Sequence, residues 1–284
     1  MQGEPGGSAN ISAAIPVQGL RTTAMATKNG WEVSGAKKWI SSATGWDGKG
    51  ADLLCIVCRG EDQGGQDLGL GILAAERPSE GIAEITIDRL IDPVGHRAHL
   101  LPEFQINNLR IPQHNAVTPM GEGGPVMAGA FTATAALVGV FGVALMRRAW
   151  DYTLRFAQTE TRGGRNPIIG HQAVGYALAD TKSAIEAARW LSWRACHALD
   201  NALPEAEELA IHAKIFGSEQ AVRVVGELMR VVGVDSYDRS CPLSGLMQDT
   251  LALPVFDGGN VGVRRKQLHQ MYKENDYDPR STLA

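Results

Sequence analysis

The chain has few of the residues that build metal sites and disulfide frameworks. Its 284 residues include four cysteines, of which Cys55 and Cys58 form the sequence CIVC. The surrounding segment ADLLCIVCRG reads as a buried strand, in which positions three apart point to opposite faces. No second CxxC or histidine pair completes a zinc site. We therefore expect no metal and no redox role for these thiols, and a reducing, intracellular setting.

An excess of charge of one sign is also lacking. The net charge of −4 gives no electrostatic argument for nucleic-acid binding. We expect no membrane span, because we identify no apolar run as long as the roughly 20 residues that a membrane helix needs. The first residues, MQGEPGGSAN, lack the basic start and apolar core of a signal peptide. The sequence predicts a soluble, globular protein of cytoplasmic or organellar location.

The first part of the chain, residues 1–118, has the pattern of short β-strands separated by glycine and proline. The dipeptide Asn29-Gly30 between two such segments is a hairpin signal. Regular spacing without intervening helices predicts an antiparallel barrel or sandwich. The expected strands are residues 21–27, 31–35, 53–59, 70–74 and 103–111.

The pattern changes after Gly121-Glu122-Gly123-Gly124-Pro125, and residues 119–284 read as an antiparallel helical bundle. Pro204 near one helix start and Gly233 just past its end match the usual preferences at helix termini. The whole chain is thus predicted to be α+β, with a β-domain before a helical domain. The expected helices are residues 126–158, 168–199, 204–232 and 257–273.

A single acid, Asp257, stands between the apolar residues Pro254-Val255-Phe256 and two glycines. A carboxylate at a helix N-terminus is commonly a cap, since it accepts backbone N–H bonds. The apolar flank favours a second interpretation, in which the acid faces a buried cavity and acts as a base. Arg264 lies at i+7, which predicts long-range or water-bridged pairing and not an i+4 salt bridge.

Five segments together resemble the acyl-CoA dehydrogenase superfamily of flavoproteins. Any one match is weak, but the order and spacing agree along nearly the whole chain. A glycine replaces the aromatic residue of the family's R-x-x-F-G pattern. The segments are GEPGGSAN (3–10), GAKKWISSA (35–43), TRGGRNPIIGHQAV (161–174), KIFGSEQA (214–221) and FDGGNVGVRR (256–265).

Within that superfamily, three features resemble the nitroalkane oxidases. Asp257 replaces the glutamate of the dehydrogenases' E-G-T segment. The stretch WISSATGWDGKGADLLCIVCR (39–59) and the stretch RVVGVDSY (230–237) are similar to segments that ordinary dehydrogenases lack.

The resemblance implies FAD as the cofactor. It assigns Trp39 to packing on the flavin ring and Ser41 to a hydrogen bond with flavin N5, both predicted on one face of a strand. It assigns Arg162 to the FAD pyrophosphate of a neighbouring subunit, for which a guanidinium is well suited. The remaining predicted cofactor contacts are Gln172, Gly258, Gly259 and Asn260.

The resemblance also implies the chemistry. Asp257 is the base that removes a carbon-bound α-proton, Arg264 positions it, and Thr134 supplies a nearby hydroxyl. A nitroalkane would give an aldehyde or ketone, nitrite and hydrogen peroxide. The alternative is an acyl-CoA dehydrogenase or oxidase acting on CH–CH groups, and the oxidant is oxygen or an electron-transferring flavoprotein.

The family's helical N-terminal domain is expected to be absent from this sequence, because Met1 stands almost on the EP-G-S loop. The resemblance further implies a homotetramer. A second alternative is therefore an inactive, shortened relative that retains only an oligomerisation module.

Overall fold

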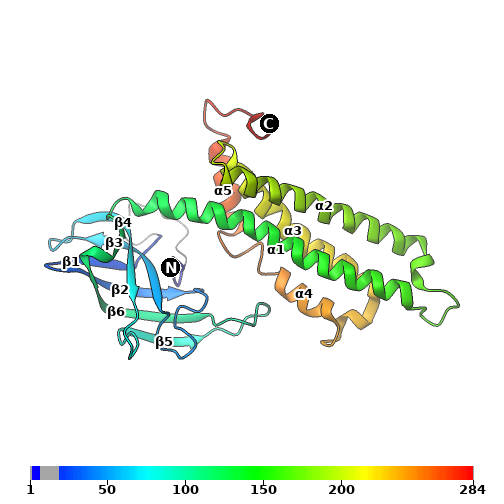
Figure 1. The fold of residues 1–284 in the computed structure, drawn as a ribbon, viewed down its shortest axis with the longest axis horizontal. Coiled ribbons are helices and arrows are strands. Elements are labelled where there is room, and N and C mark those ends of the chain that lie inside the picture. The colour runs from blue at the N-terminus through cyan, green and yellow to red at the C-terminus, as the bar shows by residue number, and fades with distance from the viewer. Residues whose placement is uncertain (1, 7–18, 284) are drawn as a thin grey trace. The chain divides into compact units, whose positions relative to one another are not determined.

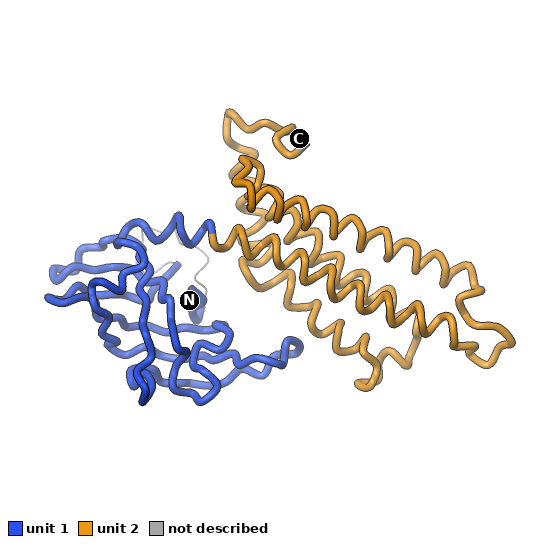
Figure 2. The backbone as a smooth tube through the Cα atoms, viewed as in Figure 1, with its two compact units in different colours: residues 1–129 blue, residues 130–284 orange. Residues whose placement is uncertain are grey.

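The structure, a computed structural model, describes residues 2–6 and 19–283. Part of the segment GEPGGSAN lies outside the described residues. The backbone divides into two compact units, Met1–Gly129 and Ala130–Ala284 (Figure 2). The predicted domain boundary at residue 118 falls just before the long helix in which this division occurs.

Unit 1 is a seven-stranded sheet with the order β5-β6-β2-β1-β3-β4-β7 (Figure 1). The antiparallel prediction is correct for every neighbouring pair except β1 and β3, which run parallel. The short edge strands β5 and β7 were not predicted. The strands are β1 (Thr23–Thr27), β2 (Gly30–Lys38), β3 (Leu53–Glu61), β4 (Asp67–Glu76), β5 (Ile85–Leu90), β6 (Pro102–Pro112) and β7 (Ala116–Thr118).

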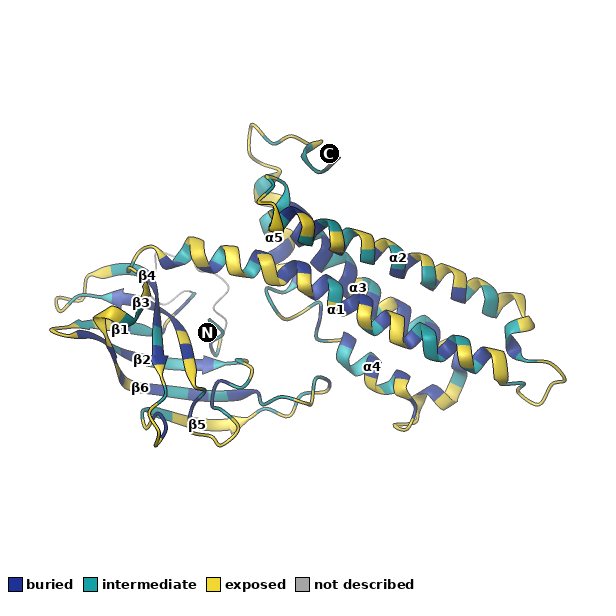
Figure 3. Ribbon diagram, viewed as in Figure 1, coloured by how far each residue is buried: buried dark blue, intermediate teal, exposed yellow. Residues whose placement is uncertain are grey.

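The hairpin predicted at Asn29-Gly30 joins β1 to β2, with Thr27 paired to Gly30. A Cβ on Gly30 would lie 2.2 Å from the carbonyl oxygen of Ile111 in β6, so only glycine fits at this close approach. In β3, Cys55 is exposed and Cys58 is buried. Both lie in β3, part of the sheet coloured by burial in Figure 3, where positions three apart point to opposite faces, as predicted.

Two of the sequence segments quoted above meet inside unit 1 through a buried ion pair. Lys37 Nζ lies 2.9 Å from Glu4 Oε1 and 3.0 Å from the carbonyl oxygen of Val57. Glu4 also accepts hydrogen bonds from the backbone N–H of Arg21 and from the N–H and hydroxyl of Thr22. Burial raises the pKa of Glu4, but Lys37 and these donors outweigh it and leave the pKa below its usual value.

Unit 2 is a helical bundle, and its first helix begins in unit 1. The glycine at 233 ends α3 with φ 79°, as predicted, and α4 was not predicted. The helices are α1 (Gly123–Thr159), α2 (Gln172–Asp200), α3 (Ala206–Val232), α4 (Pro242–Thr250) and α5 (Arg265–Met271).

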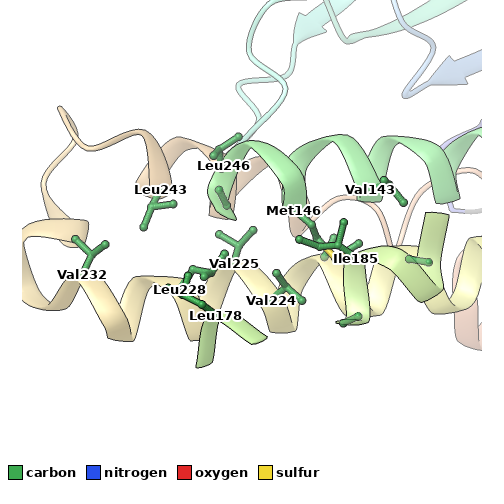
Figure 4. Close-up of a cluster of buried hydrophobic side chains, with 14 of the residues drawn as sticks. Val143, Met146, Leu178, Ile185, Val224, Val225, Leu228, Val232, Leu243 and Leu246 are labelled. Atoms are coloured by element: carbon green, nitrogen blue, oxygen red, sulfur yellow. The ribbon is translucent and has the colours of Figure 1, made fainter. Parts of the chain in front are cut away.

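The main core of unit 2 lies between α1, α2, α3 and α4. Met146, Ile185, Val225 and Leu243 bring one apolar side chain from each helix into it (Figure 4). A second cluster, rich in alanine, lies between α1, α2 and α3 and includes Ala135 and Ala213. These two clusters pack together the helices that contribute residues to the candidate site.

One expectation about apolar length was wrong. Helix α1 is long and apolar enough to cross a membrane by length and composition, with a mean hydropathy of 1.9 over 18 residues. The expectation failed because alanine, glycine and threonine stand between the larger apolar residues of α1. A search for consecutive bulky apolar side chains therefore misses this run. The core helices of soluble proteins pass the same test, and α1 contributes Val138 and Met146 to the main core.

Candidate active site

Asp257 lies in the loop between α4 and α5, where its backbone has φ 50°. Aspartate is one of the few residues other than glycine that tolerate this left-handed conformation. The predicted helix 257–273 was therefore wrong at its start. It is replaced by a π-helical turn, Asn260–Arg264, followed by α5.

Arg264 contacts Asp257 directly. Its Nη2 lies 3.2 Å from Asp257 Oδ2 and 2.9 Å from the backbone oxygen of the same residue. The prediction of long-range or water-bridged pairing is corrected, because the left-handed turn and the wide π-helical turn fold residue 264 back onto residue 257. The Arg264 side chain is fully buried, whereas that of Asp257 is 15% exposed.

Helix α1 supplies the other side of the site. Thr134 Oγ1 lies 2.9 Å from Asp257 Oδ1, which fits a hydroxyl that donates to the carboxylate. Arg264 Nη2 also donates to the carbonyl oxygen of Phe131, 2.9 Å away. The three predicted catalytic residues, Asp257, Arg264 and Thr134, are thus brought together, with one partner on each carboxylate oxygen.

The charges of the site follow from this burial. Burial lowers the pKa of Arg264, and the neighbouring Asp257 carboxylate opposes the shift. Arginine nevertheless stays protonated at neutral pH.

The two glycines after Asp257 have explanations within the chain. Gly258 has φ 70°, and a Cβ there would lie 3.1 Å from Arg264 Nε. Glycine therefore admits the guanidinium against the backbone. Gly259 immediately precedes the π-helical turn, whose Arg264 N–H and Val263 N–H both donate to the Gly259 carbonyl. Their role as flavin contacts stays a prediction.

Asn260, a predicted cofactor contact, is buried among side chains of α3. Its Oδ1 accepts a hydrogen bond from Lys214 Nζ at 2.7 Å. Its Nδ2 donates to Ser218 Oγ at 2.9 Å and to Glu219 Oε1 at 3.2 Å. Both amide hydrogens are thus used within unit 2, whereas Oδ1 keeps a second lone pair, and a cofactor contact of Asn260 stays a prediction.

Three residues of the segment KIFGSEQA had no predicted role, namely Lys214, Ser218 and Glu219. A signal was present for two of them, because positions i and i+4, here Lys214 and Ser218, lie on one face of a helix. Lys214 also lies in the mostly apolar stretch from Leu209 to Gly217, in which His212 is the other polar side chain, and a fully buried lysine is unusual.

Two other predicted cofactor residues lie elsewhere in unit 2. Arg162 has φ 51°, its Nη1 lies 2.7 Å from Asp235 Oδ2, and its guanidinium lies 5.2 Å from the centre of the Phe156 ring. Gln172 is the first residue of α2 and donates to the hydroxyl of Tyr176. The structure brings neither residue to Asp257.

The remaining two, Trp39 and Ser41, belong to unit 1. Their predicted place on one strand was wrong, because β2 ends at Lys38 and Trp39 has φ 62°. Ser41 lies in the turn that follows. Trp39 is 56% exposed, and Lys38 Nζ lies 5.9 Å from the centre of its ring, so the indole is partly open to stacking on a planar ring. This observation fits a flavin contact for Trp39.

A metal centre has no basis in the described part of the chain. Across residues 2–6 and 19–283, no group of three or more histidine, cysteine, aspartate or glutamate side chains could hold a metal ion.

Comparison with known proteins defines the class first. Residues 121–271 match the family model "Acyl-CoA dehydrogenase, C-terminal domain", and the chain belongs to this family. The family is one of FAD-dependent flavoprotein oxidoreductases, which confirms the predicted fold and cofactor class.

Within this family, the chain is similar in sequence to several nitroalkane oxidases and acyl-CoA dehydrogenases. The chain is 38% identical to a nitroalkane oxidase of Podospora anserina over 97% of its length, and 34% identical to that of Fusarium oxysporum over 98%. It spans about two thirds of those relatives, 66% and 67%. The solved Podospora structure superposes with a TM-score of 0.92 and covers 99% of this chain, which in turn spans 69% of that chain. The short-chain specific acyl-CoA dehydrogenase of Bos taurus is 27% identical over 90% of this chain, which spans 58% of its length.

Proposed function

We propose that this chain carries the base of an FAD-dependent oxidoreductase, and that Asp257 removes a carbon-bound α-proton from a nitroalkane. The observation that carries the proposal is the contact of Asp257 with Arg264 on one oxygen and Thr134 on the other. Related nitroalkane oxidases support it. In those enzymes an aspartate and an arginine seven positions apart take part in the reaction, and Asp257 and Arg264 have the same separation.

The roles of the three side chains follow from their geometry. The Asp257 side chain is 15% exposed, so its carboxylate can reach a substrate carbon. Arg264 fixes the carboxylate through Oδ2, and the Thr134 hydroxyl fixes it through Oδ1. A related nitroalkane oxidase has an active-site serine whose alanine variant was crystallised with 1-nitrohexane, and Thr134 would supply a corresponding hydroxyl here. Such positioning matters because a misplacement of about 1 Å can cost about 100-fold in rate.

FAD would supply the acceptor for the electron pair that leaves the substrate carbon. Trp39 and Ser41 are the residues of unit 1 that we propose to hold its ring system, and Arg162 and Gln172 those that we propose to contact it from a neighbouring subunit. The overall reaction converts a nitroalkane, oxygen and water to an aldehyde or ketone, nitrite and hydrogen peroxide. A homotetramer is proposed with it.

The second candidate is an acyl-CoA dehydrogenase or oxidase with aspartate as its base. The observation that favours it is the similarity to the short-chain acyl-CoA dehydrogenases. An electron-transferring flavoprotein would then replace oxygen as the oxidant. The length of the base argues against this candidate. The Asp257 side chain is one methylene shorter than the glutamate of those enzymes, so its carboxylate reaches less far.

One assay separates these functions. FAD-loaded protein is supplied with nitroethane or with a short acyl-CoA, and nitrite release and reduction of an electron-acceptor dye are measured. Nitrite with nitroethane supports the proposal, and dye reduction with acyl-CoA alone supports the second candidate. Protein that takes up no FAD on titration would instead be an oligomerisation module.

A further inference from the structure

Lys214 carries a charged group into the interior of unit 2. Its side chain is fully buried on α3, and its ammonium donates to Asn260 Oδ1 at 2.7 Å. A buried ammonium is costly unless its hydrogen bonds are satisfied, so an apolar residue would suit a purely structural role better. The place of this charge beside the candidate site calls for a more specific explanation.

Asn260 is the point at which the loop carrying Asp257 closes. Its backbone N–H donates to the carbonyl oxygen of Pro254 at 2.8 Å, across the loop. Its side chain is held by three side chains of α3, those of Lys214, Ser218 and Glu219. One residue therefore fixes both the end of the loop and the start of the π-helical turn to a rigid helix.

The same turn delivers the arginine. Arg264 is the last residue of the π-helix that Asn260 begins, and its guanidinium reaches back to the backbone oxygen and the carboxylate of Asp257. A shift of Asn260 would move the turn, and with it both partners of this pair. Lys214 itself has no hydrogen bond to Asp257 or Arg264 among those of the described residues, so its influence passes through Asn260.

We propose that Lys214 is a positioning residue for the Asp257–Arg264 pair, acting through its hydrogen bond to Asn260. Its effect on the proton-transfer step rests on the proposed function, but its effect on the placement of Arg264 does not. The charged groups that act on Lys214 are Arg264, Asp257 and Glu219. Glu219 is in turn paired with Arg265, at 2.8 Å.

The test compares Lys214→Met with Lys266→Met, a matched change at an exposed lysine of α5. The full-length, FAD-loaded protein is labelled with ¹⁵N-arginine, and the Nε–H signal of Arg264 is assigned with Arg264→Lys. In the parent protein and in Lys266→Met we expect a slowly exchanging signal. In Lys214→Met we expect this signal to shift and its exchange with water to accelerate at least tenfold. An unchanged signal would overturn the proposal.

The kinetic arm measures the rate of flavin reduction in a single turnover with nitroethane. Lys214→Met should slow this step by about 10- to 100-fold, as expected for a displaced base, while bound FAD stays constant. If the parent protein reduces its flavin with neither nitroethane nor an acyl-CoA, the proposed function fails, and the Arg264 signal still decides the role of Lys214.

A second variant covers the case in which methionine unfolds the chain. Lys214→Gln keeps a polar, uncharged group, but its amide stops short of Asn260 Oδ1. The same change of the Arg264 signal is expected in it, and an unaltered signal in a folded Lys214→Gln protein contradicts the proposal.

Discussion

Burial of the charged Lys214 side chain next to the candidate site reduces the stability of the folded protein. Burial and, to a lesser extent, the Arg264 charge lower the pKa of its ammonium, Asp257 and Glu219 oppose the shift, and the net pKa is about 8. The unfolded chain has the ordinary lysine pKa of 10.5. Between these values the unfolded state binds the proton and the folded state does not. The contribution of Lys214 to stability is therefore least favourable below about pH 8 and improves as the pH rises toward 10.5.

A pH series of urea unfolding measures this contribution. The free energy of unfolding of the parent protein, minus that of Lys214→Met, should rise between pH 8 and pH 10, by at most about 1.4 kcal/mol per pH unit. Below pH 7 the difference should be flat. Since all other groups are shared by the two proteins, their titrations cancel. A difference that stays constant up to pH 10 would show that the Lys214 pKa is not lowered in the folded state.

At the scale of helices, α1 and α3 approach through glycines. A Cβ on Gly142 would lie 2.5 Å from the carbonyl oxygen of Gly217, and a Cβ on Gly217 would lie 2.8 Å from the Cα of Gly139. These contacts involve backbone atoms, which cannot move aside as a flexible side chain can. The close crossing holds Thr134 on α1 near the α3 face that carries Lys214.

The variant Gly142→Ala tests this packing. We expect it to lower the free energy of unfolding by about 1–3 kcal/mol, because the added methyl must push two helix backbones apart. The control is Gly245→Ala in α4, where an added Cβ meets nothing within 4 Å. That change should be neutral or stabilise the protein by up to about 1 kcal/mol. Equal effects of the two variants on the urea midpoint would contradict a close α1–α3 contact.

Helices with strong apolar character could be predicted from sequence, whereas the turn of the site could not. The three long helices were predicted to within a few residues, because alanine, leucine and other helix-forming residues predominate in each of them. Helix α4 was missed, since its nine residues include Pro242 and Gly245. The direct Asp257–Arg264 contact was missed because a left-handed residue and a π-helical turn leave no periodic signal. Asp257, Arg264 and Thr134 were found from the family resemblance and not from periodicity.

At the scale of the whole chain, the hydrophobic interior is divided. The cluster that includes Leu73 and Phe104 lies in unit 1, and the clusters that include Met146 and Ala213 lie in unit 2. In unit 1 the Glu4–Lys37 pair is buried, with 2% and 0% of the side chains exposed. Each unit therefore has its own core and its own stabilising interactions, and the two are expected to unfold in separate steps.

Calorimetry of the full-length chain with two variants checks this expectation. Glu4→Gln leaves Lys37 buried beside a neutral partner and should lower the stability of unit 1 by about 3–5 kcal/mol. Gly142→Ala should lower only the transition of unit 2. We expect two heat-absorption peaks, each moved by one variant. A single peak that either variant shifts would show that the chain unfolds as one cooperative body.

The claim on which the functional account depends is that the Asp257 carboxylate is the base. The most direct measurement is the rate of flavin reduction by nitroethane, without oxygen, in the parent protein, in Asp257→Asn and in Asp276→Asn, which changes an exposed acid near the C-terminus. Asparagine tolerates the left-handed backbone at residue 257, so the fold and bound FAD should be retained. We expect the rate to fall by about 100- to 10,000-fold in Asp257→Asn and to stay unchanged in Asp276→Asn. An Asp257→Asn protein that reduces its flavin at the parent rate would contradict the account.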